Sequence, residues 1–183
     1  MKKTFTISLL VLSISLLAAC NSGYTPDRSY MTQEQRAQEQ KKLDEAIEKN
    51  KNATTDIEKI ESASSIGFRN MNLGNYSEAI NYYKKVIELD DANFPALNNL
   101  AAMYEEMGDI TTAIKYIGML YDRYTDNAEV NTDFIRLLIK NNQLVEATRV
   151  VEAYKLTEKA KNNVDFIKSL EKSIEEAKQK EQK

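Results

Sequence analysis

Histidine is absent from this chain of 183 residues, and there is a single cysteine, Cys20. The lack of histidine removes the commonest proton shuttle near neutral pH and the commonest ligand of transition metals. A single cysteine excludes an intramolecular disulfide and a cysteine cluster for zinc. The sequence therefore offers none of the usual zinc centres and no histidine-based catalysis.

Glycine, proline and tryptophan are also scarce, with five, two and no residues respectively. Hydrophobic residues make up 42% of the chain and charged residues 29%, and Ala, Leu, Ile, Glu and Lys are plentiful. This composition favours helix over sheet, and the length is sufficient for one domain with its own core. The formal net charge of −3 is mild and argues against a nucleic-acid binder that works by counterion release.

No catalytic motif is recognisable. The patterns G-x-S-x-G and the P-loop are missing, and H-E-x-x-H is impossible without histidine. Adjacent acids such as Glu105 and Glu106 would point about 100° apart on a helix, which makes them poor acid–base partners. We therefore predict that the protein is not an enzyme and has no catalytic residue, cofactor or metal.

The first twenty residues, MKKTFTISLLVLSISLLAAC, have the pattern of a secretory signal peptide. Lys2 and Lys3 precede an apolar run from about Phe5 to Leu17, and small residues follow before Cys20. The apolar run is shorter than the ~20 residues that a membrane-spanning helix needs. Residues 1–19 are therefore predicted to be a signal that is removed.

The stretch Leu17-Ala18-Ala19-Cys20 resembles the lipobox of bacterial lipoproteins. This resemblance implies that Cys20 is acylated through a thioether diacylglycerol and becomes the new N-terminus; two or more acyl chains hold a bilayer firmly. The alternatives to a lipoprotein signal are an uncleaved membrane anchor and an ordinary signal peptide in which the cysteine occurs by chance. In lipoproteins of bacteria with two membranes, Asp after the cysteine tends to mark inner-membrane retention. Asn21 therefore favours the periplasmic face of the outer membrane over that of the inner membrane.

Two segments precede the regular part of the chain. Residues 20–31 contain Gly, Pro, Ser and Asn without periodicity, which predicts a lipidated flexible tether. Residues 32–59 predict a polar helical segment that begins with a capping box of Thr32 and Gln35. Its apolar content is thin, so we expect it to dock only partly, through Leu43 and Ile47.

A motif recurs at a step of 34 residues. GNYSEAI at 74–80 returns as GDITTAI at 108–114 and, more faintly, as NQLVEAT at 142–148. Each glycine can end one helix in the left-handed conformation, and a polar residue can then cap the next. The caps that we expect are Asn75, Asp109 and Asp126.

Apolar positions follow the same step. Three alanines and three larger residues recur at this interval: Ala79, Ala113, Ala147, and Ile66, Leu100, Phe134. After each alanine, apolar residues continue at helical spacing along one face. Small residues, Gly67 and Ala101, stand at the matching position of the first helix, so the two helices of a unit can approach closely.

A unit of 34 residues with two helices is the signature of tetratricopeptide (TPR) repeats, and residues 60–160 resemble that family. The resemblance implies an all-α, right-handed α-solenoid of about three hairpins, at 60–93, 94–127 and 128–160. An N-terminal helix would precede them and a C-terminal capping helix and tail, 161–183, would follow.

The third unit departs from the pattern. Ile135 replaces the small residue, Asn142 replaces glycine, and Lys159 begins a polar stretch, which predicts a looser unit. The last apolar stripe is out of phase with a fourth repeat and is interpreted as a cover for the final apolar face. Its members are Val164, Ile167, Leu170 and Ile174.

In TPR proteins, the first helices of the units line a concave groove that usually binds peptides or helices of partner proteins. The groove positions carried over residue by residue are Phe68, Met71, Asn72, Asn98, Asn99, Ala102, Glu105, Glu106, Thr132, Arg136, Ile139 and Lys140. The alternative for Phe68 and Met71 is that they pack on the N-terminal helix. The known carboxylate clamp is not expected, because only Asn99 matches it and acids, Glu129 and Asp133, stand where cations are needed.

Together these features predict a membrane-anchored TPR lipoprotein that acts as a scaffold or adaptor for a protein or peptide partner at the cell envelope, in an envelope complex or in pilus or secretion assembly. The alternative is a structural envelope protein without a peptide ligand that self-associates, as a homo-oligomer, through the third unit.

Overall fold

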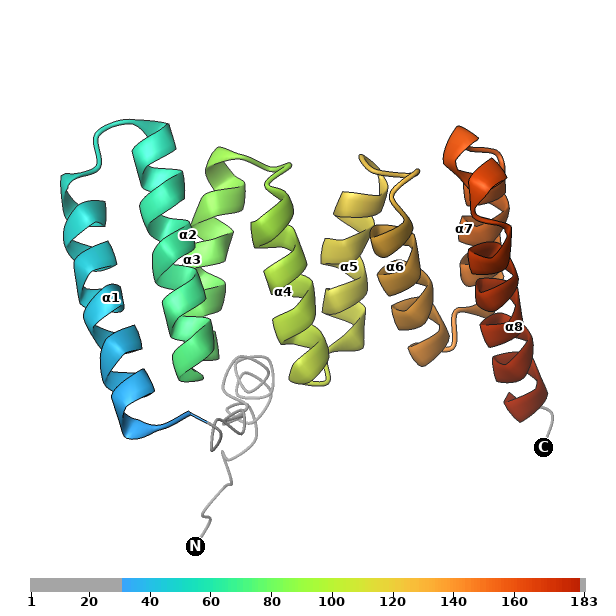
Figure 1. Ribbon diagram of the computed structural model, residues 1–183, viewed down its shortest axis with the longest axis horizontal. Helices are drawn as coiled ribbons and strands as arrows, with labels where there is room; N and C mark the ends of the chain where they lie inside the picture. The colour runs from blue at the N-terminus through green and yellow to red at the C-terminus, as the bar shows by residue number, and fades with distance from the viewer. Residues whose placement is uncertain (1–30, 182–183) are drawn as a thin grey trace, which may run out of the picture.

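The computed structural model describes residues 31–181, so the expected signal segment and Cys20, the expected site of acylation, lie outside the described residues. The described part contains helices and no strand: α1 (Gln33–Asn52), α2 (Asp56–Leu73), α3 (Tyr76–Leu89), α4 (Phe94–Glu106), α5 (Ile110–Tyr121), α6 (Ala128–Lys140), α7 (Leu144–Lys155), the 3-10 helix η2 (Glu158–Asn162) and α8 (Val164–Glu181). The helices stand in a row, and each packs against the next (Figure 1). This arrangement confirms the expected all-α solenoid.

The turns after α2, α4 and α6 confirm the 34-residue step. Gly74 and Gly108 both have φ of 84°, and Asn142 has φ of 59°. Asparagine tolerates the left-handed conformation better than most residues other than glycine, so the third turn keeps its shape without glycine.

Two of the expected helix starts are confirmed. Thr32 and Gln35 form a capping box at α1. Asp109 caps α5, because its carboxylate accepts a hydrogen bond from the Thr112 N–H at 3.0 Å. A second capping box, of Thr55 and Glu58, starts α2 at Asp56, four residues before the expected start of the repeats.

Two other expected caps are wrong. Asn75 stands at the start of α3, but its side chain caps nothing and donates instead to Oδ1 of Asn70 at 3.2 Å. Asn127, and not Asp126, caps α6, since its side-chain oxygen accepts from two backbone N–H groups of the first turn. Asp126 instead forms an ion pair with Lys159 at 2.9 Å.

The recurring alanines lie where the helices cross. Ala79, Ala113 and Ala147 are all 0% exposed. Gly67 in α2 faces Tyr83 in α3, and a Cβ atom on Gly67 would lie 3.1 Å from the tyrosine ring. Burial raises the pKa of Tyr83 to about 12, so its hydroxyl stays protonated within the core. The first hairpin therefore depends on the missing side chain at Gly67.

The third hairpin has a closed apolar core, but its two helices make fewer contacts with each other than those of the first two hairpins, which agrees with the expectation of a looser unit. Ile135 is 1% exposed although it replaces a small residue, and Val151 is equally buried. The polar stretch after α7 is not frayed, because Thr157 caps η2 by accepting from the Ala160 N–H.

The C-terminal end is covered by α8, which packs against both α7 and α6. Leu170 and Ile174 are buried, and Phe166 meets Tyr154 of α7 edge-on at 5.5 Å. Val164, expected in the same stripe, is 52% exposed, which corrects that assignment. Leu170 lies 36 residues after Phe134, two more than the repeat step, because η2 lengthens the connection.

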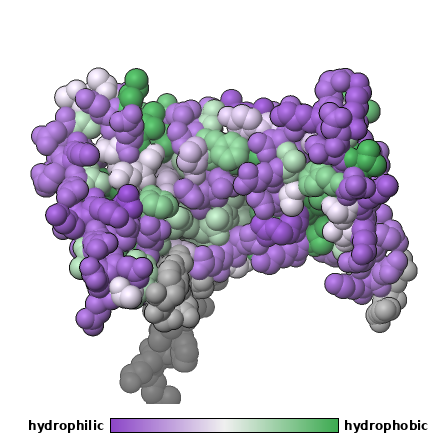
Figure 2. Space-filling model, in the orientation of Figure 1, coloured by the Kyte–Doolittle hydropathy of each residue, from purple (hydrophilic) through white to green (hydrophobic). Residues whose placement is uncertain are grey.

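The N-terminal end is covered by α1, whose outer surface is largely hydrophilic (Figure 2). Leu43 and Ala46 are buried against Ile66 of α2, with Ile47 packed beside them, which confirms the expected docking. The apolar contact is small, so polar contacts carry part of the attachment.

Glu39 supplies those polar contacts. Its carboxylate accepts hydrogen bonds from Arg69 at 3.0 Å, from Asn72 at 3.1 Å and from Lys42 at 3.0 Å. Burial acts to raise the pKa of Glu39, but the three hydrogen bonds outweigh it and hold the pKa at about 2. A buried carboxylate thus joins α1 to α2.

Gly67→Ala tests the close approach in the first hairpin. Tyr83 is 1% exposed and cannot swing away, so the added methyl group is expected to lower the free energy of unfolding by about 1–3 kcal/mol. Gly118→Ala is the matched control, because a Cβ there would meet the Phe134 ring at 3.8 Å, an ordinary contact. The control should gain roughly 0.5–1 kcal/mol from helix propensity. Urea denaturation measures both, and equal effects of the two variants would contradict the packing.

Glu39→Gln tests the attachment of α1. Removing the charge should weaken the attachment by about 1–2 kcal/mol at pH 7, seen as roughly tenfold faster amide exchange in α1. Because the folded-state pKa lies below the ordinary value of 4.5, the contribution is complete above pH 4.5 and is lost as the pH falls towards 2. The gap between native protein and variant should therefore shrink on acidification. Glu45→Gln, on the exposed side of α1, is the control, and a similar effect there would contradict the role of Glu39.

Candidate partner groove

The groove residues of the first hairpin fall into three different environments. Phe68 is 41% exposed, with the Arg69 guanidinium 5.0 Å from its ring centroid. Met71 packs against the main core rather than against the cluster under α1. Asn72 donates its amide to Glu39 of α1. The N-terminal helix therefore engages Asn72, while Phe68 remains open to a partner.

Two asparagines of α4 were predicted to bind a partner's backbone. Asn99 donates its amide to the Tyr83 hydroxyl at 2.8 Å, so one of its donors belongs to the core. Asn98 is half-buried and Ala102 is exposed. Glu106 accepts a hydrogen bond from Tyr76 of α3, which directs it to the neighbouring helix. Ala102 is thus the freest of these positions, and the binding role of all four stays a prediction.

Three predicted residues from two units meet in one ion-pair network. Glu105 of α4 accepts from Arg136 of α6 and, at 3.2 Å, from Lys140 of α6. Arg136 also pairs with Asp133 at 3.1 Å. The hydrogen bond from Arg136, against an opposing effect of burial, lowers the pKa of Glu105, and Lys140 adds to it. This bridge, called the α4–α6 bridge below, crosses the row of first helices at its middle.

A cavity of about 550 Å³ opens on the other side of α6, between α6 and α8. Its lining includes three predicted groove residues, together with residues of α8 that the sequence analysis treated only as a cover. The lining residues are Thr132, Ile135, Arg136, Ile139, Asn142, Leu170, Ser173, Glu176, Ala177 and Lys180. The available signal was the spacing of Leu170, Ser173, Ala177 and Lys180, which places them on one face of a helix. We call this cavity the α6–α8 groove.

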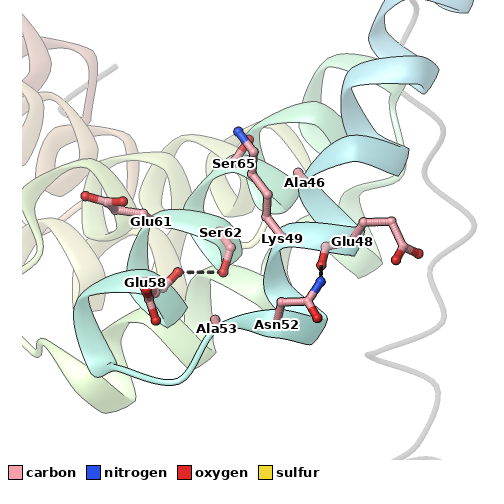
Figure 3. Close-up of a pocket in the computed structure, with 9 residues that line it drawn as sticks. All are labelled: Ala46, Glu48, Lys49, Asn52, Ala53, Glu58, Glu61, Ser62 and Ser65. Carbon is pink, nitrogen blue, oxygen red and sulfur yellow. Dashed lines mark hydrogen bonds between the residues drawn. The ribbon is translucent and has the colours of Figure 1, made fainter.

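A second hollow, of about 520 Å³, lies between the end of α1 and the start of α2 (Figure 3). The side chains of Glu48 and Glu61 point away from each other on opposite sides of it. Glu58 is committed to its cap, where hydrogen bonds from the backbone N–H groups of Thr55 and Thr54 lower its pKa to about 2. Glu48 and Glu61 therefore do not form a carboxylate pair in this hollow.

Two general features bear on function. No group of His, Cys, Asp or Glu side chains within residues 31–181 could hold a metal ion. None of the helices in this part of the chain has the length and apolar character needed to cross a bilayer.

Comparison with known proteins supports the repeat. A family model described as TPR repeat matches residues 71–108, which run from the end of α2 through α3 and α4 to the turn before α5. A search of curated proteins gives no match. TPR repeats generally act as modules for interaction between proteins rather than as enzymes. The matched residues of this chain include α4, which carries the predicted groove residues Asn98, Asn99 and Ala102.

Proposed function

We propose that the protein is a lipid-anchored adaptor of the bacterial cell envelope, which holds a protein partner on the face formed by α2, α4, α6 and α8. The observation that carries this proposal is the open row of helix pairs with both ends covered, by α1 and α8. A row of this kind leaves one extended surface of first helices rather than a closed pocket. Exposed Phe68 and Ala102, and the α6–α8 groove, lie on that surface.

The anchor rests on the signal segment and on the lipobox that ends at Cys20. Twelve residues, 21–32, would separate the acylated cysteine from the start of α1. A chain of that length spans at most ~40 Å, which would keep the repeats within reach of the membrane surface. Asn21 favours the outer membrane, and the assemblies that such an adaptor would serve include envelope complexes and pilus or secretion machinery.

Self-association without a ligand is the second candidate, and the described residues favour it less. Its expected basis was exposed faces at a loosely packed third unit. Val145 and Leu156 are exposed there, whereas Ile135 and Val151 are buried. Leu170 and Ile174 of α8 then cover the end of that unit. A second copy would therefore have to pair through separate exposed residues such as Val145, Leu156 and Val164 rather than through the apolar face that α8 covers.

Cys20→Ala tests the anchor. Without the thioether-linked acyl chains the protein is expected to leave the membrane fraction, whereas the native protein is expected to sediment with membranes and to resist a carbonate wash. Ser22→Ala, two residues away, is the control and should stay bound. Mass spectrometry of the N-terminal peptide reports the acyl chains directly. Continued membrane binding of Cys20→Ala would reject the anchor without affecting the partner surface.

A photo-crosslinking residue at Ala102 tests the adaptor role. Ala102 is exposed on α4, so a partner on the first-helix face should be captured from intact cells at this position. Ala153 is equally classed as exposed but lies on α7, a second helix, and crosslinks there should be at least several-fold weaker. Crosslinks from Ala102 only to other copies of this chain would instead support self-association.

A further inference from the structure

The α6–α8 groove has two walls, and each wall is a single helix face. Thr132, Ile135 and Ile139 repeat at steps of three and four residues along α6, and Asn142 follows in the turn after it. Leu170, Ser173, Ala177 and Lys180 repeat in the same way along α8. The α8 wall, residues 170–180, spans ~15 Å or about three turns, and the helical part of the α6 wall, residues 132–139, spans about two turns.

The floor of the groove is apolar. Ile135 and Leu170 lie deepest, and Ile139 and Ala177 are partly exposed above them. The hydroxyl groups of the walls donate to their own helices, from Thr132 to the Ala128 carbonyl at 2.7 Å and from Ser173 to the Ser169 carbonyl at 3.0 Å. The walls therefore offer apolar contact and few free donors, which suits a ridge of apolar side chains better than a small polar ligand.

The charges along the groove are unevenly matched. Arg136 is already paired through the α4–α6 bridge, and Glu176 is paired with Lys172 of α8 at 3.7 Å. Lys180 makes no ion pair with any side chain that the structure describes. One end of the groove thus carries a positive charge that an anionic group of a partner would complement.

We propose, on the basis of the adaptor function above, that the α6–α8 groove binds an amphipathic helix of the partner, about three turns long, with a carboxylate that meets Lys180. Apolar side chains at positions i, i+3 and i+7 of that helix pack between the two walls, against Ile135, Ile139 and Leu170. An extended peptide would turn alternate side chains away from the floor and leave half of its apolar contacts unmade. The capping helix is then half of a binding site as well as a cover.

Fluorescence anisotropy with designed peptides tests this proposal on the full-length chain in detergent. The first probe is a 14-residue labelled helix with leucine at i, i+3 and i+7 and glutamate at one end. A second probe carries lysine in place of glutamate, and a third carries a central proline that breaks the helix. We expect the first probe to bind with at least tenfold higher affinity than the other two.

Ala177→Trp, Lys180→Glu and Lys168→Glu locate the binding. Tryptophan at 177 fills the groove and should weaken binding of the acidic probe at least tenfold. Lys180→Glu should weaken the acidic probe about three- to tenfold and strengthen the lysine probe. Lys168, exposed on α8 and outside the groove, is the charge control, and Lys168→Glu should bind the acidic probe within twofold of the native protein. Circular dichroism verifies that each variant is folded.

Equal binding of the acidic probe to native protein and Ala177→Trp, or equal binding of all three probes, would overturn the proposal. So would a complete lack of binding by the acidic probe. These results leave the adaptor function standing as long as crosslinks from Ala102 to another protein persist. If the Ala102 crosslinks are lost in Ala177→Trp but persist in Lys168→Glu, this would support the groove as the place where the native partner docks.

Discussion

The close approach of the two helices within each hairpin is the constraint on which the rest of the structure depends. Gly67, Ala101 and Ile135 stand at one position of the three units, and Tyr83, Ile117 and Val151 stand 16 residues later in each. All six are buried. The first residue grows from glycine to isoleucine while the second shrinks from tyrosine to valine. We infer that each unit keeps roughly the same volume between its helices, since volume-conserving exchanges are the best tolerated in a packed core. Ile135 is therefore accommodated in the core, although α6 and α7 make fewer contacts with each other than the paired helices of the first two units.

A row of hairpins built in this way has two ends that cannot bury their own apolar faces, and the chain covers each end by different means. At the C-terminal end, α8 contributes Leu170, Ile174 and the aromatic contact of Phe166 with Tyr154. At the N-terminal end, α1 contributes fewer apolar residues and adds a buried carboxylate, Glu39, with three hydrogen-bond donors. A buried charge is favourable only while all its partners are in place, so Arg69 and Asn72 define where α1 sits. Because its amide is bound to Glu39, Asn72 is not available to bind a partner.

The sequence predicted those features that depend on neighbouring residues. The left-handed turns at Gly74 and Gly108 and the cap at Asp109 follow from local backbone chemistry, and the 34-residue step placed the buried alanines. Prediction from the sequence failed where a residue far along the chain interacts with the side chain in question. Asp126 was expected to cap α6, but Lys159, far along the chain, pairs with it, and Asn127 takes its place. The Glu39 network and the α8 wall of the groove join residues 30 or more positions apart, and no local pattern reports such contacts.

The face of first helices is divided by its own charges. On the α2 side, Phe68 is open and Asn72 and Asn99 are held by Glu39 and Tyr83. In the middle, the α4–α6 bridge ties Glu105 to Arg136 and Lys140, and a partner that enters there has to break or cover ion pairs that are already satisfied. Beyond α6 the floor of the groove, with Ile135 and Leu170, is apolar, and the paired charges Arg136 and Glu176 lie on its walls. The cost of removing water from charged groups therefore favours docking on the C-terminal side of this face. There the connection before α8 is two residues longer than the one before α6, and α8 forms the second wall of the groove.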